Sequence, residues 1–169
     1  MPLDWAPPPI SLSGRSKKLP DFISWMMCAP VVSQRAKVEL ESVLGHCVQW
    51  FPFHEIKGKR YFAMNVTNIQ SNILDVGKSD LLYADNSRTE ILKVKGAVFV
   101  DPLPVELPPI FKIRAPNGNV LGDVYVTKRF AEIAIRQKIT GIALADPAQE
   151  ALPLILRDQP LNVVLGIVD

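Results

Sequence analysis

Apolar residues recur at helical spacing in two segments of the chain, about 33–44 and 128–138. Ser33 is a good N-cap for the first segment, because its hydroxyl accepts from the free amides of a first helical turn. Gly45 follows the segment at the point where a left-handed stop is easiest. The apolar positions of this segment share one helix face: Ala36, Leu40, Val43 and Leu44. The pattern predicts an amphipathic, half-buried helix.

The second segment carries the same signals. Thr127 precedes it as a cap, and Arg136 and Lys138 fall in its last turn, where cations complement the helix dipole. Its inward positions are Phe130, Ile133 and Ala134. At a constant offset, the two segments match pairwise: Val32 with Val126, Ser33 with Thr127, Arg35 with Arg129, and Val48 with Ile142. We interpret this as a repeated helix–strand unit, arising either by duplication or because capped helices followed by strands are common.

Short apolar runs predict the strands around these helices. Lys57-Gly58-Lys59 is a turn between the first two runs, and Asn117-Gly118 is the strongest hairpin signal in the chain. Residues 67–89 are loop-rich, and the four prolines of 101–109 exclude that stretch from a sheet interior. The expected strands are 48–51, 61–66, 91–94, 97–100, 110–114, 120–126 and 139–144. Together these elements predict an α+β fold with mixed or antiparallel sheets.

The composition divides the chain into three parts. Residues 1–20 form an extended leader rich in proline and serine, and residues 21–146 form the α+β domain. Residues 147–169 are an apolar C-terminal extension that would aggregate if it were left exposed. We expect this extension to pack on the domain or on a partner, a homodimer being one such arrangement.

Composition and charge exclude several function classes. The 169 residues are 48% hydrophobic, which is enough for a sizeable core, and the net charge is only +2. The basic clusters Arg15-Lys17-Lys18 and Lys57-Lys59-Arg60 are short and separated, so nucleic-acid binding is not expected. No signal peptide and no apolar run of about 20 residues is visible. With Cys28 and Cys47 as reduced core thiols, we expect a soluble cytoplasmic protein without a membrane partner.

The candidate chemistry is sparse. His46-Cys47 and His54-Glu55 are the places where nucleophile and base types sit close, and adjacent strand residues point to opposite faces. Asp75, Asp80 and Asp85 are spaced too widely for a calcium loop, and the glycines are too isolated for a phosphate loop. We therefore predict no catalytic, cofactor-binding or metal-ligating residue. A small hydrolase or transferase using Cys47 or His54 is the alternative.

A partner surface is the better expectation. The 67–89 stretch is longer than compact domains usually leave without structure, and such loops are often functional. Tyrosine, tryptophan and arginine dominate the energetics of protein interfaces. The predicted partner-binding residues are Trp25, Asp75, Asp80, Tyr83, Asp85 and Arg88.

An ordered set of motifs then resembles the immunity-protein eleven family of bacterial polymorphic toxin systems, over roughly residues 20–145. The motifs are Asp21-Phe22, Val31-Val32-Ser33-x-Arg35-Ala36, Val48-Gln49-Trp50-Phe51-Pro52, Tyr61-Phe62-Ala63-Met64-Asn65-Val66, Ile73-Leu74-Asp75, Ser79, Ile110-Phe111, Val126-Thr127 and Ile139-Thr140-Gly141-Ile142.

The resemblance implies a non-enzymatic α+β protein of the bacterial cytoplasm that acts in interbacterial competition. Such a protein binds a cognate toxin encoded beside it and neutralises the toxin by stoichiometric occlusion. The leader and the C-terminal extension lie outside the motif set. A structural subunit that oligomerises through the extension is a further alternative.

Overall fold

The computed structural model describes residues 6–7, 18–26, 29–84, 86–103, 106–148 and 163–168. Within these ranges the chain forms two α-helices and three sheets with mixed and antiparallel strands, which confirms the α+β class. The helices are α1 (Gln34–Leu44) and α2 (Lys128–Arg136), with a 3-10 turn η1 (Gly45–Cys47) after α1. The strands are β1 (Phe22–Met26), β2 (Ala29–Ser33), β3 (Val48–Pro52), β4 (Tyr61–Val66), β5 (Ile69–Ser71), β6 (Asp80–Tyr83), β7 (Ile91–Gly96), β8 (Ile110–Arg114), β9 (Tyr125–Thr127), β10 (Ile142–Ala145) and β11 (Val163–Val168).

The first sheet has the strand order β1-β2-β4-β3, and every pairing in it is antiparallel. Since β4 is antiparallel to both β2 and β3, these two strands run parallel to each other, and α1 connects them. The β2–α1–β3 segment is therefore a split β-α-β unit with β4 inserted between its strands. The predicted hairpin of the 48–51 and 61–66 runs is present as the β3–β4 pair.

The second sheet has the order β10-β11-β9-β8-β5 and repeats this arrangement around α2. Here β11 lies between β9 and β10 and is parallel to both. The two expected helix–strand units are thus both split β-α-β units, and they differ in the direction of the inserted strand. Residues 163–168 of the C-terminal extension supply this central strand, so both edges of β11 are already paired within the chain.

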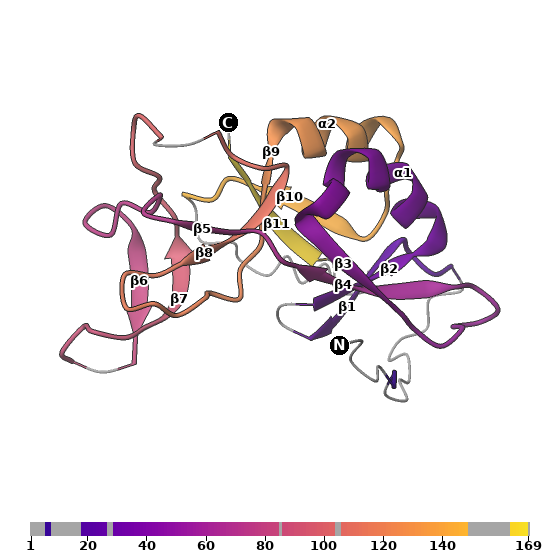
Figure 1. Ribbon diagram of the computed structural model, residues 1–169, viewed down its shortest axis with the longest axis horizontal. Coiled ribbons are helices and arrows are strands. Elements are labelled where there is room, and N and C mark those ends of the chain that lie inside the picture. Colours follow the sequence, from indigo (N-terminus) through magenta and orange to yellow (C-terminus); the bar gives the residue numbers. More distant parts are fainter. Residues whose placement is uncertain are drawn as a thin grey trace.

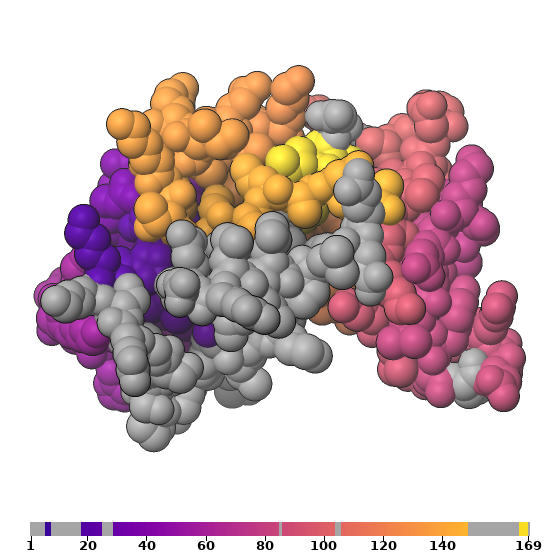
Figure 2. All heavy atoms as spheres, turned by 180° about the vertical axis from the view of Figure 1, so that it is seen from behind, coloured from indigo at the N-terminus to yellow at the C-terminus, as the bar shows by residue number. Residues whose placement is uncertain are grey.

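The two units share one hydrophobic core, in which α1 and α2 lie side by side (Figure 1). The side chains buried from α1 are the four that its apolar stripe predicts: Ala36, Leu40, Val43 and Leu44. Phe130 and Ala134 of α2 belong to the same cluster. Both sheets contribute further buried residues to it: Phe22, Val32, Val48, Met64 and Val66 from the first sheet, and Ile110 and Val126 from the second. Seen from behind, α2 and β10 in orange lie along the top of the molecule, and β11 in yellow lies between the indigo N-terminal part and the pink part of the chain (Figure 2).

A lobe built from residues 67–103 lies at the opposite end of the long axis from the helices (Figure 1). It contains the antiparallel β6–β7 hairpin, and it packs on β8 and β9 through a second core cluster. At the centre of that cluster, the rings of Phe111 and Tyr125 are stacked with centroids 5.8 Å apart. Phe99 packs edge-on against Tyr125 at 5.5 Å. Aromatic packing of this kind anchors the lobe to the second sheet.

Several predicted boundaries were wrong, for identifiable reasons. Residues 97–100 form only an isolated bridge, between Phe99 and Leu74. The pairing extends no further because the Ala97 amide donates to the Pro147 carbonyl and the Val98 amide to the Ser79 hydroxyl. The last predicted strand begins only at Ile142, since Lys138 and Gly141 have positive φ. Residues 67–89 are loop-rich as expected, with two short strands, β5 and β6, where one short helical or extended piece was expected.

Three local expectations also need correction. The second arm of the Asn117-Gly118 hairpin is reduced to a bridge from Arg114 to Val120 before β9 begins. Thr127 occupies the N-cap position of α2 but makes no capping hydrogen bond through its side chain. His46 and Cys47 belong to the 3-10 turn rather than to a strand, so the alternation argument does not apply to them.

Among the described residues, no helix has the length and apolar character needed to cross a membrane.

Candidate functional site

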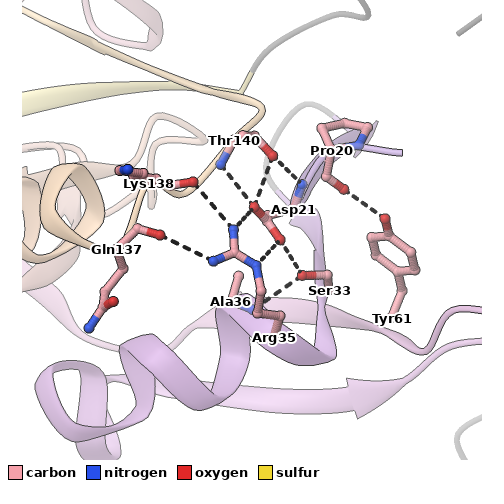
Figure 3. A network of polar contacts seen from close by, with 9 residues as sticks. All are labelled: Pro20, Asp21, Ser33, Arg35, Ala36, Tyr61, Gln137, Lys138 and Thr140. Carbon is pink, nitrogen blue, oxygen red and sulfur yellow. Dashed lines mark hydrogen bonds and ion pairs between the residues drawn. The ribbon is translucent and has the colours of Figure 1, made fainter. Parts of the chain in front are cut away.

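The densest polar network of the described chain surrounds the Asp21 carboxylate where α1 begins (Figure 3). Ser33, the N-cap of α1, donates from Oγ to Asp21 Oδ1 at 2.8 Å and accepts from the Ala36 amide at 3.1 Å. Thr140 donates to Asp21 Oδ2 from its amide at 3.0 Å and from its hydroxyl at 2.9 Å. Arg35 donates from Nε to Oδ1 at 3.2 Å and from Nη2 to Oδ2. This carboxylate therefore holds β1, the start of α1 and the segment before β10 together.

Arg35 also reaches the end of the other helix. Its Nη1 donates to the Gln137 carbonyl at 3.1 Å, and its Nη2 donates to the Lys138 carbonyl at 3.3 Å. These carbonyls lie at and just beyond the C-terminal end of α2, where the helix dipole favours a cation. Arg129, which matches Arg35 in the sequence repeat, is exposed at the start of α2. Only the first copy of the unit uses its arginine to join the two helices.

The ionisation of this network suits a structural role. Burial alone would raise the pKa of Asp21, but Arg35 and the donors from Thr140 and Ser33 hold it below its ordinary value. Burial and the nearby charge of Asp21 raise the pKa of Tyr61 to about 12, and its hydroxyl donates to the Pro20 carbonyl at 2.7 Å. Asp21 is thus ionised and Tyr61 neutral around pH 7, so neither group is tuned for proton transfer there.

The predicted partner-binding residues do not form one cluster. Tyr83 and Arg88 come together in the lobe, where the guanidinium carbon lies 5.8 Å from the tyrosine ring centroid. Asp75 is occupied by its own turn: it accepts from the Gly77 and Lys78 amides, and the Lys78 ammonium lies 3.0 Å away. Lys78 and these amides lower the pKa of Asp75.

The remaining predicted residues are dispersed or not described. Asp80 is exposed at the start of β6. Trp25 belongs to β1, but its side chain lies outside the described part of the structure, and so does Asp85. The structure therefore supports contact only between Tyr83 and Arg88.

The lobe displays two exposed leucines that the sequence analysis did not select. Leu81 and Tyr83 of β6 pair with Val94 and Ile91 of β7 and pack toward the second core cluster. Leu82 points the other way and is 42% exposed, and Leu92 is 57% exposed. The exposure of Leu82 could have been predicted from the sequence, because successive side chains of a strand such as β6 point to opposite faces. A bulge opposite Leu92 interrupts the alternation of β7 and hides the pattern there.

The surroundings of Cys47 and His54, the candidate nucleophile and base, favour structural roles for both residues. Cys47 is buried, with its sulfur 3.9 Å from Asn68 Nδ2, and burial raises the pKa of its thiol. Burial therefore disfavours the thiolate that nucleophilic attack requires. His54 Nε2 lies 3.1 Å from the Pro7 carbonyl, which can only accept, so this nitrogen carries the proton. Cys28 lies outside the described residues.

In the described part of the chain, no group of three or more histidine, cysteine, aspartate or glutamate side chains is arranged to hold a metal ion. Neither a protein-family model nor a curated protein matches the chain.

Proposed function

We propose that this chain is a non-catalytic immunity protein that neutralises a cognate bacterial toxin by stoichiometric binding in the cytoplasm. The observation that carries the proposal is the lobe of residues 67–103, which combines exposed Leu82 and Leu92 with the Tyr83–Arg88 pair. Exposed apolar side chains are typical of protein-binding surfaces, and so are tyrosine and arginine, although Leu82 and Tyr83 project from opposite faces of β6. The ordered motifs that resemble the immunity-protein eleven family supply the toxin as the kind of partner.

The rest of the described chain supports a binding role over chemistry. The Asp21 network is occupied by internal partners, and no buried side-chain nitrogen or oxygen among the described residues lacks a hydrogen bond. The alternative of a hydrolase or transferase using Cys47 or His54 requires an activated side chain. The raised thiol pKa of Cys47 opposes that activation.

The test is co-expression with the protein encoded by the neighbouring reading frame in a sensitive bacterial strain. We expect the chain to restore growth and to co-purify with that protein at a one-to-one ratio. The double variant Leu82→Asp/Leu92→Asp should lose both effects, because two carboxylates would have to be buried in the interface. Failure of the unmodified chain to protect cells or to bind the neighbouring protein would contradict the proposal.

A matched control separates loss of binding from loss of folding. Val38 is 58% exposed, similar to Leu92, and belongs to α1, which lies well away from β6 and β7 (Figure 1). Val38→Asp should therefore retain protection and co-purification. Circular dichroism and thermal unfolding of both variants should match the unmodified chain. Equal loss of protection in the two variants would place the interface elsewhere.

A further inference from the structure

A hollow of about 370 Å³ opens where α1 begins, beside the Asp21 network. It lies between the N-terminal turn of α1 and the connection from β3 to β4. Its wall combines charged, polar and apolar groups: Leu19, Asp21, Ser33, Gln34, Arg35, Lys59, Arg60 and Tyr61. Three cations and a single carboxylate therefore border it.

The polar groups at the floor of the hollow already have hydrogen-bond or ion-pair partners within the chain. The Asp21 carboxylate is neutralised by Arg35 and accepts further hydrogen bonds from Ser33 and Thr140. The Tyr61 hydroxyl donates to the Pro20 carbonyl. A ligand would consequently meet no uncompensated negative charge at the floor. The positive charge that remains available to an anion belongs to the side chains at the rim.

The rim carries two exposed cations, Lys59 and Arg60. No ion pair found among the described residues includes Lys59. Arg60 Nε lies 3.7 Å from Glu55 Oε1, and both side chains are largely exposed. Exposed pairs of this kind are weak, so a better-placed anion can replace Glu55. The rim backbone is fixed independently, because the Arg60 carbonyl accepts from the Gln34 amide at 2.9 Å.

We propose that this hollow binds a carboxylate from an acidic segment of a protein partner. The guanidinium of Arg60 matches the geometry of a carboxylate, and Lys59 adds a second positive charge. Leu19 and the aliphatic stems of the two cations offer an apolar wall for the methylene groups of a glutamate. A nucleic acid would require a longer row of cations. The site does not depend on the toxin-neutralising role.

The test is an NMR titration of the full chain with a hexaglutamate peptide at low salt. We expect saturable shifts centred on residues 33–36 and 59–61. The double variant Lys59→Ala/Arg60→Ala should bind about tenfold more weakly. Lys128→Ala/Arg129→Ala is the matched control, since it removes an adjacent, exposed Lys–Arg pair at the start of the other helix. This control should bind hexaglutamate like the unmodified chain.

Two further titrations, with inorganic phosphate and with a single-stranded oligonucleotide, test whether the hollow prefers a carboxylate to a phosphate group. Weaker binding of both than of hexaglutamate supports a carboxylate site. Tighter binding of either one overturns it. Absence of saturable shifts at these residues, or equal weakening in the two double variants, also overturns the proposal. Equal weakening would show that net charge rather than the hollow determines binding.

Discussion

Asp21 and Thr140 are separated by 119 residues in the sequence and exchange three hydrogen bonds in the fold. The Asp21 amide donates to Thr140 Oγ1 at 3.0 Å, while Thr140 donates twice to the Asp21 carboxylate. Arg35 extends the same network to the end of α2. The two split β-α-β units are therefore joined by a shared core and also by a directional polar contact.

Asp21→Asn should destabilise the fold by about 2–3 kcal/mol in unfolding free energy. The amide removes the charge that pairs with Arg35, and its NH₂ group cannot accept the hydrogen bonds that a carboxylate oxygen accepts. Chemical denaturation at pH 7 measures this loss. Glu41→Gln, which breaks the exposed Lys37–Glu41 pair on α1, is the control and should change stability by less than about 0.5 kcal/mol. Equal losses in the two variants would contradict the bridging role of Asp21.

The Asp21 carboxylate also makes the stability of the fold depend on pH in the acidic range. The folded-state pKa of Asp21 is lowered from 3.8, so its contribution is present above the unfolded value and is lost as pH falls through the folded value. We expect the unmodified chain to lose stability below about pH 3.8 more steeply than Asp21→Asn. Denaturation midpoints between pH 2 and pH 5 provide the measurement. Parallel curves for the two proteins would show that Asp21 does not titrate in this way.

The carboxyl group of Asp123 should make stability depend on pH in the opposite direction from Asp21. Burial raises its pKa, although Lys93 and the Val94 amide act against the rise. A raised folded-state pKa means that the contribution of the group is present below the unfolded value of 3.8 and is lost as pH rises through the folded value. Asp123→Asn should therefore stabilise the protein by about 1 kcal/mol at pH 7, because a neutral amide costs less to bury than a charge. Near pH 3 the two proteins should be equally stable. A lower stability of the variant at pH 7 would contradict this account.

The local pattern of the sequence was sufficient to predict the two helices. Ser33, Gly45 and the apolar stripe of α1 lie close together in the chain, so the cap, the stop and the buried face could all be read directly. The same holds for the β3–β4 hairpin, whose strands are consecutive. These features depend on contacts within a few residues or across one turn.

Features that depend on long-range contacts could not be predicted. The position of β11 between β9 and β10 arises from parallel pairing, which carries no local turn signal. Asp21 gave no sign that Thr140 would be its partner. The hollow, too, combines residues from three segments. In the lobe, bulges in the β6–β7 pairing obscured the alternation that would have marked Leu92 as exposed.

Gly141 should tolerate no side chain. Its φ is +85°, and a Cβ there would lie 2.2 Å from the Phe22 carbonyl oxygen, which the fold holds in place beside Thr140. Gly141→Ala should cost roughly 2–5 kcal/mol, combining backbone strain with overpacking. Gly118 has a similar φ of +89° with nothing within 4 Å, so Gly118→Ala isolates the strain and should cost only about 1–2 kcal/mol. Thermal unfolding of both variants makes the comparison, and equal losses would rule out the close approach to Phe22.

Deleting residues 163–169 should disrupt the second sheet rather than dissociate an oligomer. β11 pairs along both edges within the chain, and Val168 is buried in the second core cluster. Among the described residues, its loss leaves β10 without a strand partner. Amide hydrogen exchange in Ile142–Ala145 should therefore become fast, while β4 in the first sheet retains more protection. Deletion of Asp169 alone is the control and should leave exchange unchanged. If the extension instead served self-association, light scattering would show an oligomer that becomes a folded monomer on truncation, with β10 still protected.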